Sequence, residues 1–185
     1  MIKAIETTYK GYRFRSRLEA RWAVFFDSMG LEWDYEPEGF DLENHGWYLP
    51  DFLVYSHDNE GNKFSMWIEV KGDKPSHNEI KKCEKLSNGS RKAVAIVCGS
   101  PFERPCMLFA EDTCESGGGY WEGYAVLHWN NGVLSIGCDD PRTDRDRSIY
   151  MSRGGFSNPV SSSTIMNPYY SQEARSARFE HGEKP

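Results

Sequence analysis

Three charged residues in the first half of the chain have the types and spacing of a hydrolytic centre. Asp51 follows a proline, seventeen residues separate it from Glu69, and Lys71 lies two positions further on. Carboxylate oxygens are the ligands that Mg²⁺ prefers, and a bound divalent cation activates water and neutralises a phosphate. A nearby ammonium group orients the nucleophile and stabilises developing charge. The three residues therefore indicate metal-assisted hydrolysis of a phosphodiester.

Two expected strands place these side chains on one face. Residues 64–70 alternate between apolar and other side chains, which predicts a strand. Side chains two positions apart on a strand share a face, so Glu69 and Lys71 project together while Val70 enters the core. Turn-forming residues separate this strand from a strand expected over 47–55. An antiparallel hairpin of the two would bring Asp51 opposite Glu69.

Two stretches of the sequence resemble a known superfamily. The pair Pro50-Asp51, followed by Glu69-Val70-Lys71-Gly72, resembles the signature of the PD-(D/E)-x-K nucleases. Residues 14–22 resemble the opening helix of the Holliday-junction-resolvase-like and transposon-end-nuclease-like branches, in which a helix-borne glutamate joins the metal site. Residues 33–38 resemble the strand that usually follows. The resemblance covers about residues 9–98.

The resemblance implies a fold, a cofactor and a set of site residues. The fold would be a restriction-endonuclease-like α/β domain with a mixed central β-sheet flanked by helices, to which this chain adds a C-terminal β-hairpin. The implied metal ligands for Mg²⁺, with Mn²⁺ as a substitute, are Asp51, Glu69, the Val70 carbonyl and Glu19. The implied catalytic residues are Glu19, Asp51, Glu69 and Lys71, with Lys71 activating the water. We expect a deoxyribonuclease that acts as an endonuclease rather than an exonuclease and leaves a 5′-phosphate.

Glu19 has two interpretations. A helix is expected from Ser16 to Gly30, because its apolar residues recur at helical spacing and Gly30 suits a left-handed C-terminal cap. Ser16 and Glu19 fit a capping box, in which the Glu19 carboxylate accepts the Ser16 amide and needs no metal. In the other interpretation the carboxylate contacts the metal directly or through water. The sequence leaves both roles open.

Basic residues gather before and on this helix. Residues 10–21 hold five Lys and Arg against one acid, whereas residues 27–43 hold seven acids and no Lys or Arg. The net charge of −6 opposes phosphate binding, but segregated charges make the net value a poor guide to the local field. The basic group is either a phosphate-steering patch or a solvated face paired with the acids. The candidate nucleic-acid contacts are Arg13, Arg15, Arg17, Arg21 and Lys74.

The remaining sequence predicts a crossover, further strands and a tail. A helix over 76–86 followed by a continuous apolar strand over 92–98 is typical of a strand-helix-strand crossover. Strands are expected at 106–110, 124–129 and 133–137, and Asn131-Gly132 is a strong hairpin signal. We divide the chain into a nuclease core (1–100), a β-rich extension of the same domain (101–138) and a loosely ordered tail (139–185) with a short helix near 172–179.

Composition limits the class of protein. The chain has 185 residues with 38% hydrophobic side chains, which suits one globular domain. Its longest apolar run, 93–98, is far too short to cross a bilayer, and no signal-peptide pattern precedes it. We therefore expect a cytoplasmic protein without membrane contact. Five cysteines without a C-x-x-C pair predict thiols rather than disulfides or a zinc site.

The expected partner is DNA, with RNA left open, and the chain suits a phage or mobile-element protein. Because the acidic balance predicts weak non-specific affinity, a targeting protein or a special DNA structure would direct cleavage; a homodimer is also compatible with the sequence. The alternative function is a catalytically silent nuclease-fold binding protein, an inhibitor or adaptor of another protein. Its acidic residues would then imitate nucleic acid or meet a basic surface.

Overall fold

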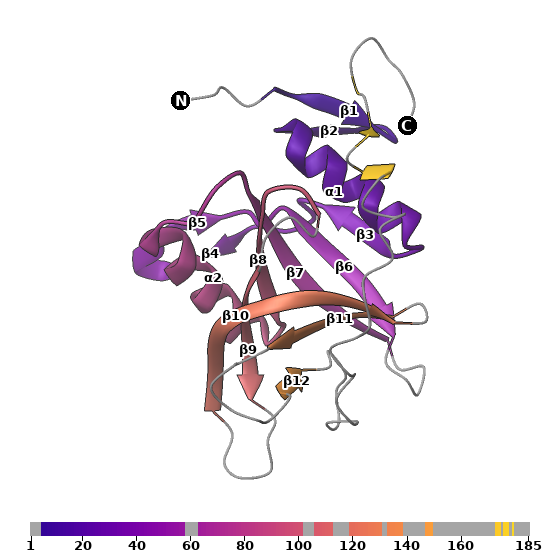
Figure 1. Cartoon of the computed structure of the whole chain (residues 1–185). Helices are drawn as coiled ribbons and strands as arrows, with labels where there is room; N and C mark the ends of the chain where they lie inside the picture. Colours follow the sequence, from indigo (N-terminus) through magenta and orange to yellow (C-terminus); the bar gives the residue numbers. More distant parts are fainter. Residues whose placement is uncertain are drawn as a thin grey trace.

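A long mixed β-sheet separates two helices, which gives the chain an α/β fold (Figure 1). The computed structural model describes residues 5–57, 63–101, 106–112, 119–130, 133–138 and 147–149, together with 173, 174, 176, 177 and 179. The sheet has eight strands, and its β7–β8 pair is parallel while its other described pairs are antiparallel. In sheet order the strands are β12 (Arg147–Ile149), β11 (Val133–Cys138), β10 (Gly119–Asn130), β9 (Cys106–Asp112), β8 (Val94–Cys98), β7 (Lys63–Lys71), β6 (Phe52–His57) and β3 (Glu32–Tyr35).

The connections around β7 follow the sequence prediction. Strands β6 and β7 form an antiparallel hairpin in which Phe52 lies opposite Ile68. Helix α2 (His77–Ser90) then carries the chain to β8, which pairs parallel to β7, so the predicted crossover is confirmed. Strand β9 adds to β8, and Asn130 pairs with Val133 between β10 and β11. The turn residues 131–132 of that predicted hairpin lie outside the described residues.

Helix α1 (Arg17–Ser28) begins and ends at the predicted signals. Ser16 is its N-cap, and the Ser16 hydroxyl accepts the Glu19 amide. At the other end Gly30 has a φ of 69°, and its amide donates to the Asp27 carbonyl. The Leu31 amide donates to the Phe26 carbonyl. These two bonds form a Schellman motif, which requires the left-handed conformation that glycine adopts without strain.

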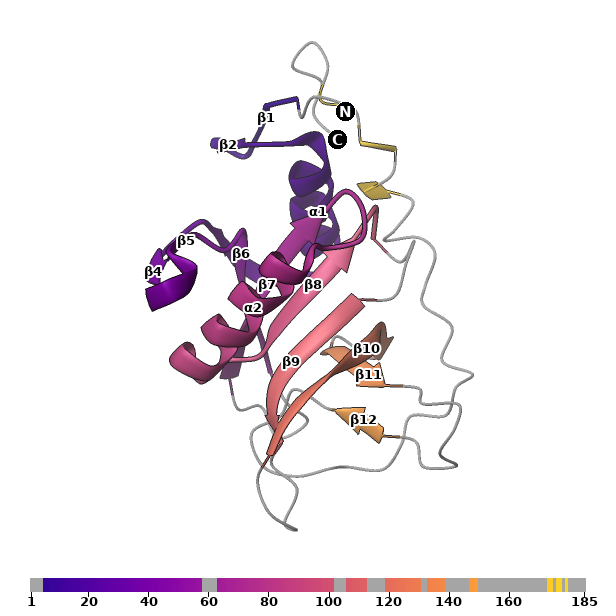
Figure 2. The same ribbon diagram turned by 90° about the vertical axis from the view of Figure 1, so that its left-hand side faces the viewer.

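The two faces of the sheet bury separate apolar cores. Met66, Ile68 and Val70 of β7 pack with α1, whereas Trp67 packs with the α2 residues Cys83 and Leu86. Because successive strand residues point to opposite faces, α1 and α2 cover opposite sides of the sheet. Figure 2 shows α2 lying along β7 and β8. Burial on both sides explains why β8 is apolar throughout.

Several short strands and hairpins differ from the sequence prediction. The strand expected over 47–55 is divided into β5 (Trp47–Tyr48) and β6, since Pro50 has no amide to donate to a sheet. β5 pairs with β4 (Phe40–Asp41) after the 3₁₀ turn η1 (Glu43–His45). The hairpin of β1 (Thr7–Tyr9) and β2 (Tyr12–Phe14) was not predicted from the sequence, and neither was β12.

Part of the C-terminal segment packs on α1. Glu173, Ala174 and Ser176 are helical, in the region where a short helix was predicted. Ala174 and Ala177 are buried in the core beside α1, a contact that the sequence did not indicate. The tail residues 139–146 and 150–172 lie outside the described residues. Within the part that is described, α1 and α2 are both too short and too polar to cross a membrane.

Candidate active site

Glu36, Asp51 and Glu69 form a row across β3, β6 and β7. The pairing of Tyr35 with Phe52 and of Phe52 with Ile68 makes these three acids the next set of neighbours along the strands. The Glu36 amide donates to the Asp51 carbonyl at 2.9 Å, which continues the β3–β6 pairing. Asp51 and Glu69 are only 3% and 4% exposed. The structure thus brings two buried carboxylates together on the face covered by α2.

The Asp51 side chain is fixed by the backbone of β7. Its Oδ2 atom accepts the Val70 amide at 2.7 Å. The Val70 side chain points to the opposite face and packs in the core beside α1, as the alternation predicted. The peptide between Glu69 and Val70 therefore determines where the Asp51 carboxylate lies.

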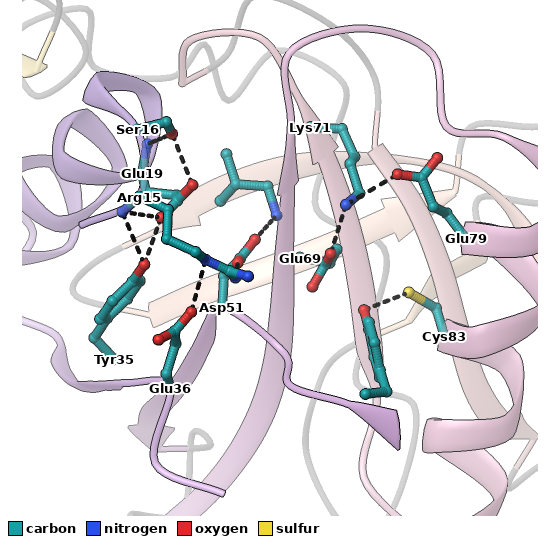
Figure 3. A network of polar contacts seen from close by, with 12 residues as sticks. Arg15, Ser16, Glu19, Tyr35, Glu36, Asp51, Glu69, Lys71, Glu79 and Cys83 are labelled. Atoms are coloured by element: carbon teal, nitrogen blue, oxygen red, sulfur yellow. Dashed lines mark hydrogen bonds and ion pairs between the residues drawn. The ribbon is translucent and has the colours of Figure 1, made fainter. Parts of the chain in front are cut away.

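Lys71 lies on the same face as Glu69 and contacts two carboxylates (Figure 3). Its Nζ atom is 2.7 Å from Glu69 Oε1 and 3.1 Å from Glu79 Oε1 at the start of α2. Burial lowers the pKa of Lys71, but the charge and hydrogen bond of Glu69 raise it more, so the net pKa is raised. Lys71 is therefore an ammonium ion in the metal-free protein.

The acidic pair has one oxygen without a partner. Glu69 Oε2 is buried and has no hydrogen-bond partner among the described residues, although Glu69 Oε1 is paired with Lys71. A buried carboxylate oxygen without a donor is costly, because it has lost its hydration without replacement. This atom marks the position where a cation or a water molecule would be most favourable.

The pKa of Asp51 responds to its burial and to the charged groups around it. Burial and the charge of Glu69 raise it, the Val70 amide and Arg15 lower it, and the net result is a pKa of about 8. A carboxyl group with a pKa this high retains a proton near neutrality unless a cation replaces it. The pair is therefore suited to exchange a proton for a metal ion.

Arg15 enters this site from the segment between β2 and α1. Its Nη2 atom donates to Asp51 Oδ1, and its Nε atom lies 2.7 Å from Glu36 Oε1. Figure 3 shows the guanidinium lying between the two carboxylates. Arg15 was predicted only as a nucleic-acid contact. One of its partners, Glu36, belongs to the acidic segment 27–43. For Arg15, the predicted pairing of the basic residues with these acids is therefore present.

Glu19 contacts the site through its neighbours. Its Oε1 atom accepts the Ser16 hydroxyl at 2.7 Å, and its Oε2 atom accepts the Tyr35 hydroxyl at 2.6 Å and the Arg15 amide at 3.1 Å. The predicted capping box is therefore formed only in part, because the carboxylate accepts the Ser16 hydroxyl and the next upstream amide. Glu19 raises the pKa of Asp51 but its oxygens are directed at these three donors.

The donor set fits a magnesium ion that keeps several waters. Within the described part of the chain, no three or more Asp, Glu, His or Cys side chains are grouped so as to hold a metal. Asp51 and Glu69 nevertheless offer hard oxygen ligands, including the unpartnered Glu69 Oε2. Acidic side chains outnumber basic ones here, since Glu19, Glu36, Asp51, Glu69 and Glu79 surround Arg15 and Lys71.

Gly99 connects the site to α1. Its amide donates to the Lys71 carbonyl at 2.8 Å, and its own carbonyl accepts Trp22 Nε1 at 3.0 Å. Gly99 has a φ of 72°, a conformation that favours glycine. The sequence did not indicate this contact between Trp22 and Gly99. A glycine directly after an apolar strand was the signal that could have indicated such a turn.

The other predicted nucleic-acid contacts occupy different positions around the site. Arg13 is exposed and pairs with Glu6, while Arg17 and Arg21 lie on α1 and are partly buried. Lys74 is exposed in the loop between β7 and α2, three residues after Lys71. Of the five basic candidates, Arg15 makes the ion pair with Asp51.

The two cysteines that the structure describes are free thiols, as predicted. Cys83 and Cys98 are free and buried, and Cys83 Sγ lies 3.3 Å from the Tyr48 hydroxyl. The Tyr48 pKa is raised by burial and by the nearby Cys83 and Glu69.

Comparison of the chain with protein-family models, with curated proteins and with solved structures gives no match.

Proposed function

We propose that this protein is a magnesium-dependent nuclease of the PD-(D/E)-x-K superfamily that hydrolyses DNA phosphodiester bonds. The supporting observation is the pair of buried carboxylates, Asp51 and Glu69, with Lys71 on the same face and one Glu69 oxygen unpartnered. A buried carboxylate oxygen without a hydrogen-bond donor is available to a metal ion, although the ion-paired Glu36 Oε1 also lacks a hydrogen bond. The mixed sheet between two helices is compatible with a restriction-endonuclease-like core.

Each residue has a distinct role in the proposed reaction. A magnesium ion, when bound, would supply an activated water and neutralise the phosphate. Asp51 and Glu69 would hold the ion, with the Val70 amide fixing the Asp51 carboxylate and the adjacent Val70 carbonyl as a further ligand. Lys71 is already protonated, so it would orient the attacking water and stabilise charge on the phosphate through its ammonium group.

Glu19 acts as a positioning residue in this proposal. Its carboxylate accepts the Arg15 amide and the Tyr35 hydroxyl. It thereby fixes the chain segment that carries Arg15 against β3, next to Glu36 and Asp51. A water-mediated contact from Glu19 to the cation is compatible with its place near Asp51.

A second function is favoured by the ion pairs themselves. Asp51 and Glu69 each contact a basic side chain, Arg15 and Lys71 respectively. Such pairs would suffice to neutralise the two carboxylates in a catalytically silent nuclease fold. The protein would then be an inhibitor or adaptor whose acidic surface binds another protein.

A cleavage assay and calorimetry separate the two functions. Linear, circular, single-stranded and branched DNA would be incubated with the protein in Mg²⁺, Mn²⁺ or EDTA. We expect metal-dependent nicking of circular DNA, which identifies an endonuclease, and loss of both cleavage and metal binding in Asp51→Ala. Lys71→Ala should keep metal binding but lose cleavage by about a hundredfold or more.

Lys85→Ala is the matched control, because Lys85 is an exposed lysine on α2. It removes the same charge as Lys71→Ala and should leave metal binding and cleavage unchanged. If the wild-type protein neither binds Mn²⁺ nor cuts any of these substrates, the silent binding protein is the better description.

The acidic balance leads us to propose that targeting depends on a partner protein or on a special DNA structure. A net charge of −6 gives weak electrostatic affinity for ordinary duplex. The isolated protein should therefore prefer branched DNA or remain slow. Rapid cutting of linear duplex at physiological salt without a helper would contradict this proposal.

A further inference from the structure

The guanidinium of Arg15 occupies the outer oxygen of Asp51. Asp51 Oδ2 is committed to the Val70 amide, so Oδ1 is the atom that an incoming ligand would meet, and Arg15 Nη2 donates to it. The proposed cation needs the same oxygen. A guanidinium and a divalent cation repel each other at this separation, so both cannot use Oδ1 fully.

The Arg15 side chain is less constrained than the Arg15 backbone. Its backbone amide is fixed by Glu19, but its side chain is 55% exposed and reaches the carboxylates over a long flexible stem. Its second partner, Glu36, lies 2.7 Å from Nε and can retain the guanidinium beside the site. The Arg15 side chain therefore has room to move from Asp51 toward Glu36, whereas the Asp51 side chain is nearly fully buried and is held in place.

Once released, the guanidinium would lie at the rim of the proposed metal site. A planar cation with several donors is well suited to the oxygens of a phosphate. It would be available only after the cation has replaced it on Asp51. Entry of the metal and capture of the phosphate would then be linked through one side chain.

We propose that Arg15 is a built-in counter-ion of the site, which holds Asp51 Oδ1 in the metal-free protein, competes with the divalent cation, and contacts the substrate phosphate after displacement. This inference rests on the proposed nuclease function. It differs from a plain phosphate-binding role, because it assigns Arg15 opposite effects on metal binding and on cleavage.

The test measures Mn²⁺ affinity by isothermal titration calorimetry for the full chain and its variants. Arg15→Gln should bind Mn²⁺ about tenfold more tightly than wild type, since the ion no longer has to break a hydrogen bond between charged groups. Arg15→Lys should fall between the two, because it keeps the charge but loses the fork that reaches Glu36. In saturating Mn²⁺, Arg15→Gln should cleave DNA more slowly than wild type despite binding the metal more tightly.

Arg13→Gln is the matched control for metal affinity. Arg13 lies two residues away and pairs with exposed Glu6, so its loss removes the same charge without touching Asp51. Its Mn²⁺ affinity should equal that of wild type, and thermal melts would establish that each variant is folded. Unchanged or weaker Mn²⁺ binding in Arg15→Gln would overturn the role of Arg15 alone. Absence of Mn²⁺ binding in every folded variant and in wild type would overturn the proposed function as well.

Discussion

Replacing Asp51 by asparagine should stabilise the metal-free protein at alkaline pH. Asparagine keeps the shape of the side chain and an oxygen for the Val70 amide but carries no charge. In the folded protein the Asp51 pKa is about 8, against 3.8 in an unperturbed carboxyl group. The folded state therefore binds the proton more tightly than the unfolded state. The stability from this group is complete below about pH 4 and is lost as the pH rises toward 8.

The size of this effect follows from the same shift. About four pKa units at about 1.4 kcal/mol each give an upper limit of about 6 kcal/mol at pH 8 and above. Arg15 is 55% exposed, so water reaches the rim of the site and screens the charges. We therefore expect about half of the limit, roughly 3 kcal/mol. For a chain of this size that corresponds to about 6–12 °C in melting temperature.

Urea denaturation in EDTA at pH 5, 6, 7 and 8 would measure the effect. The difference in unfolding free energy between Asp51→Asn and wild type should grow in favour of the variant as the pH rises. Adding Mg²⁺ at pH 8 should stabilise wild type and leave the variant unchanged, because the ion replaces the proton on Asp51. Parallel pH profiles for the two proteins would refute the argument, since they would mean that Asp51 is not destabilised by its surroundings.

Three further substitutions test the supports of the site. Trp22→Phe leaves the Gly99 carbonyl without its donor and should lower the unfolding free energy by about 1–3 kcal/mol in chemical denaturation. Tyr35→Phe removes a donor to the Glu19 carboxylate and should cost about 1–2 kcal/mol of unfolding free energy. Gly30→Ala places a side chain at a φ of 69° and should lower the melting temperature by a few degrees, from a cost of about 1 kcal/mol. A melting temperature equal to wild type for any of the three would contradict the corresponding contact.

Local signals in the sequence were sufficient for most of the elements around the site. The alternation in β7, the capping residues of α1 and α2, and the turn between β6 and β7 are short-range patterns. They predicted the hairpin that places Asp51 opposite Glu69. Strand periodicity also predicted that Lys71 shares the face of Glu69, because side chains two positions apart point the same way.

The residues that the sequence analysis missed are brought in from other parts of the chain. Glu36 reaches the row through the pairing of β3 with β6, and Glu79 meets Lys71 because α2 packs across β7. Gly99 connects Lys71 to Trp22, and Trp22 and Gly99 are 77 residues apart in the sequence. Contacts over such separations depend on how sheets and helices pack, and neither periodicity nor capping rules contain that information.

The period of a strand and a local turn were enough to predict that two acids and a lysine lie on one face of a strand pair. The balance of those charges depends on long-range packing. The tertiary structure directed Glu19 to Ser16, Tyr35 and the Arg15 amide, and it placed the Arg15 guanidinium on Asp51. Charges interact through space and respond to burial, so their partners depend on the packed arrangement of the whole sheet and its two helices.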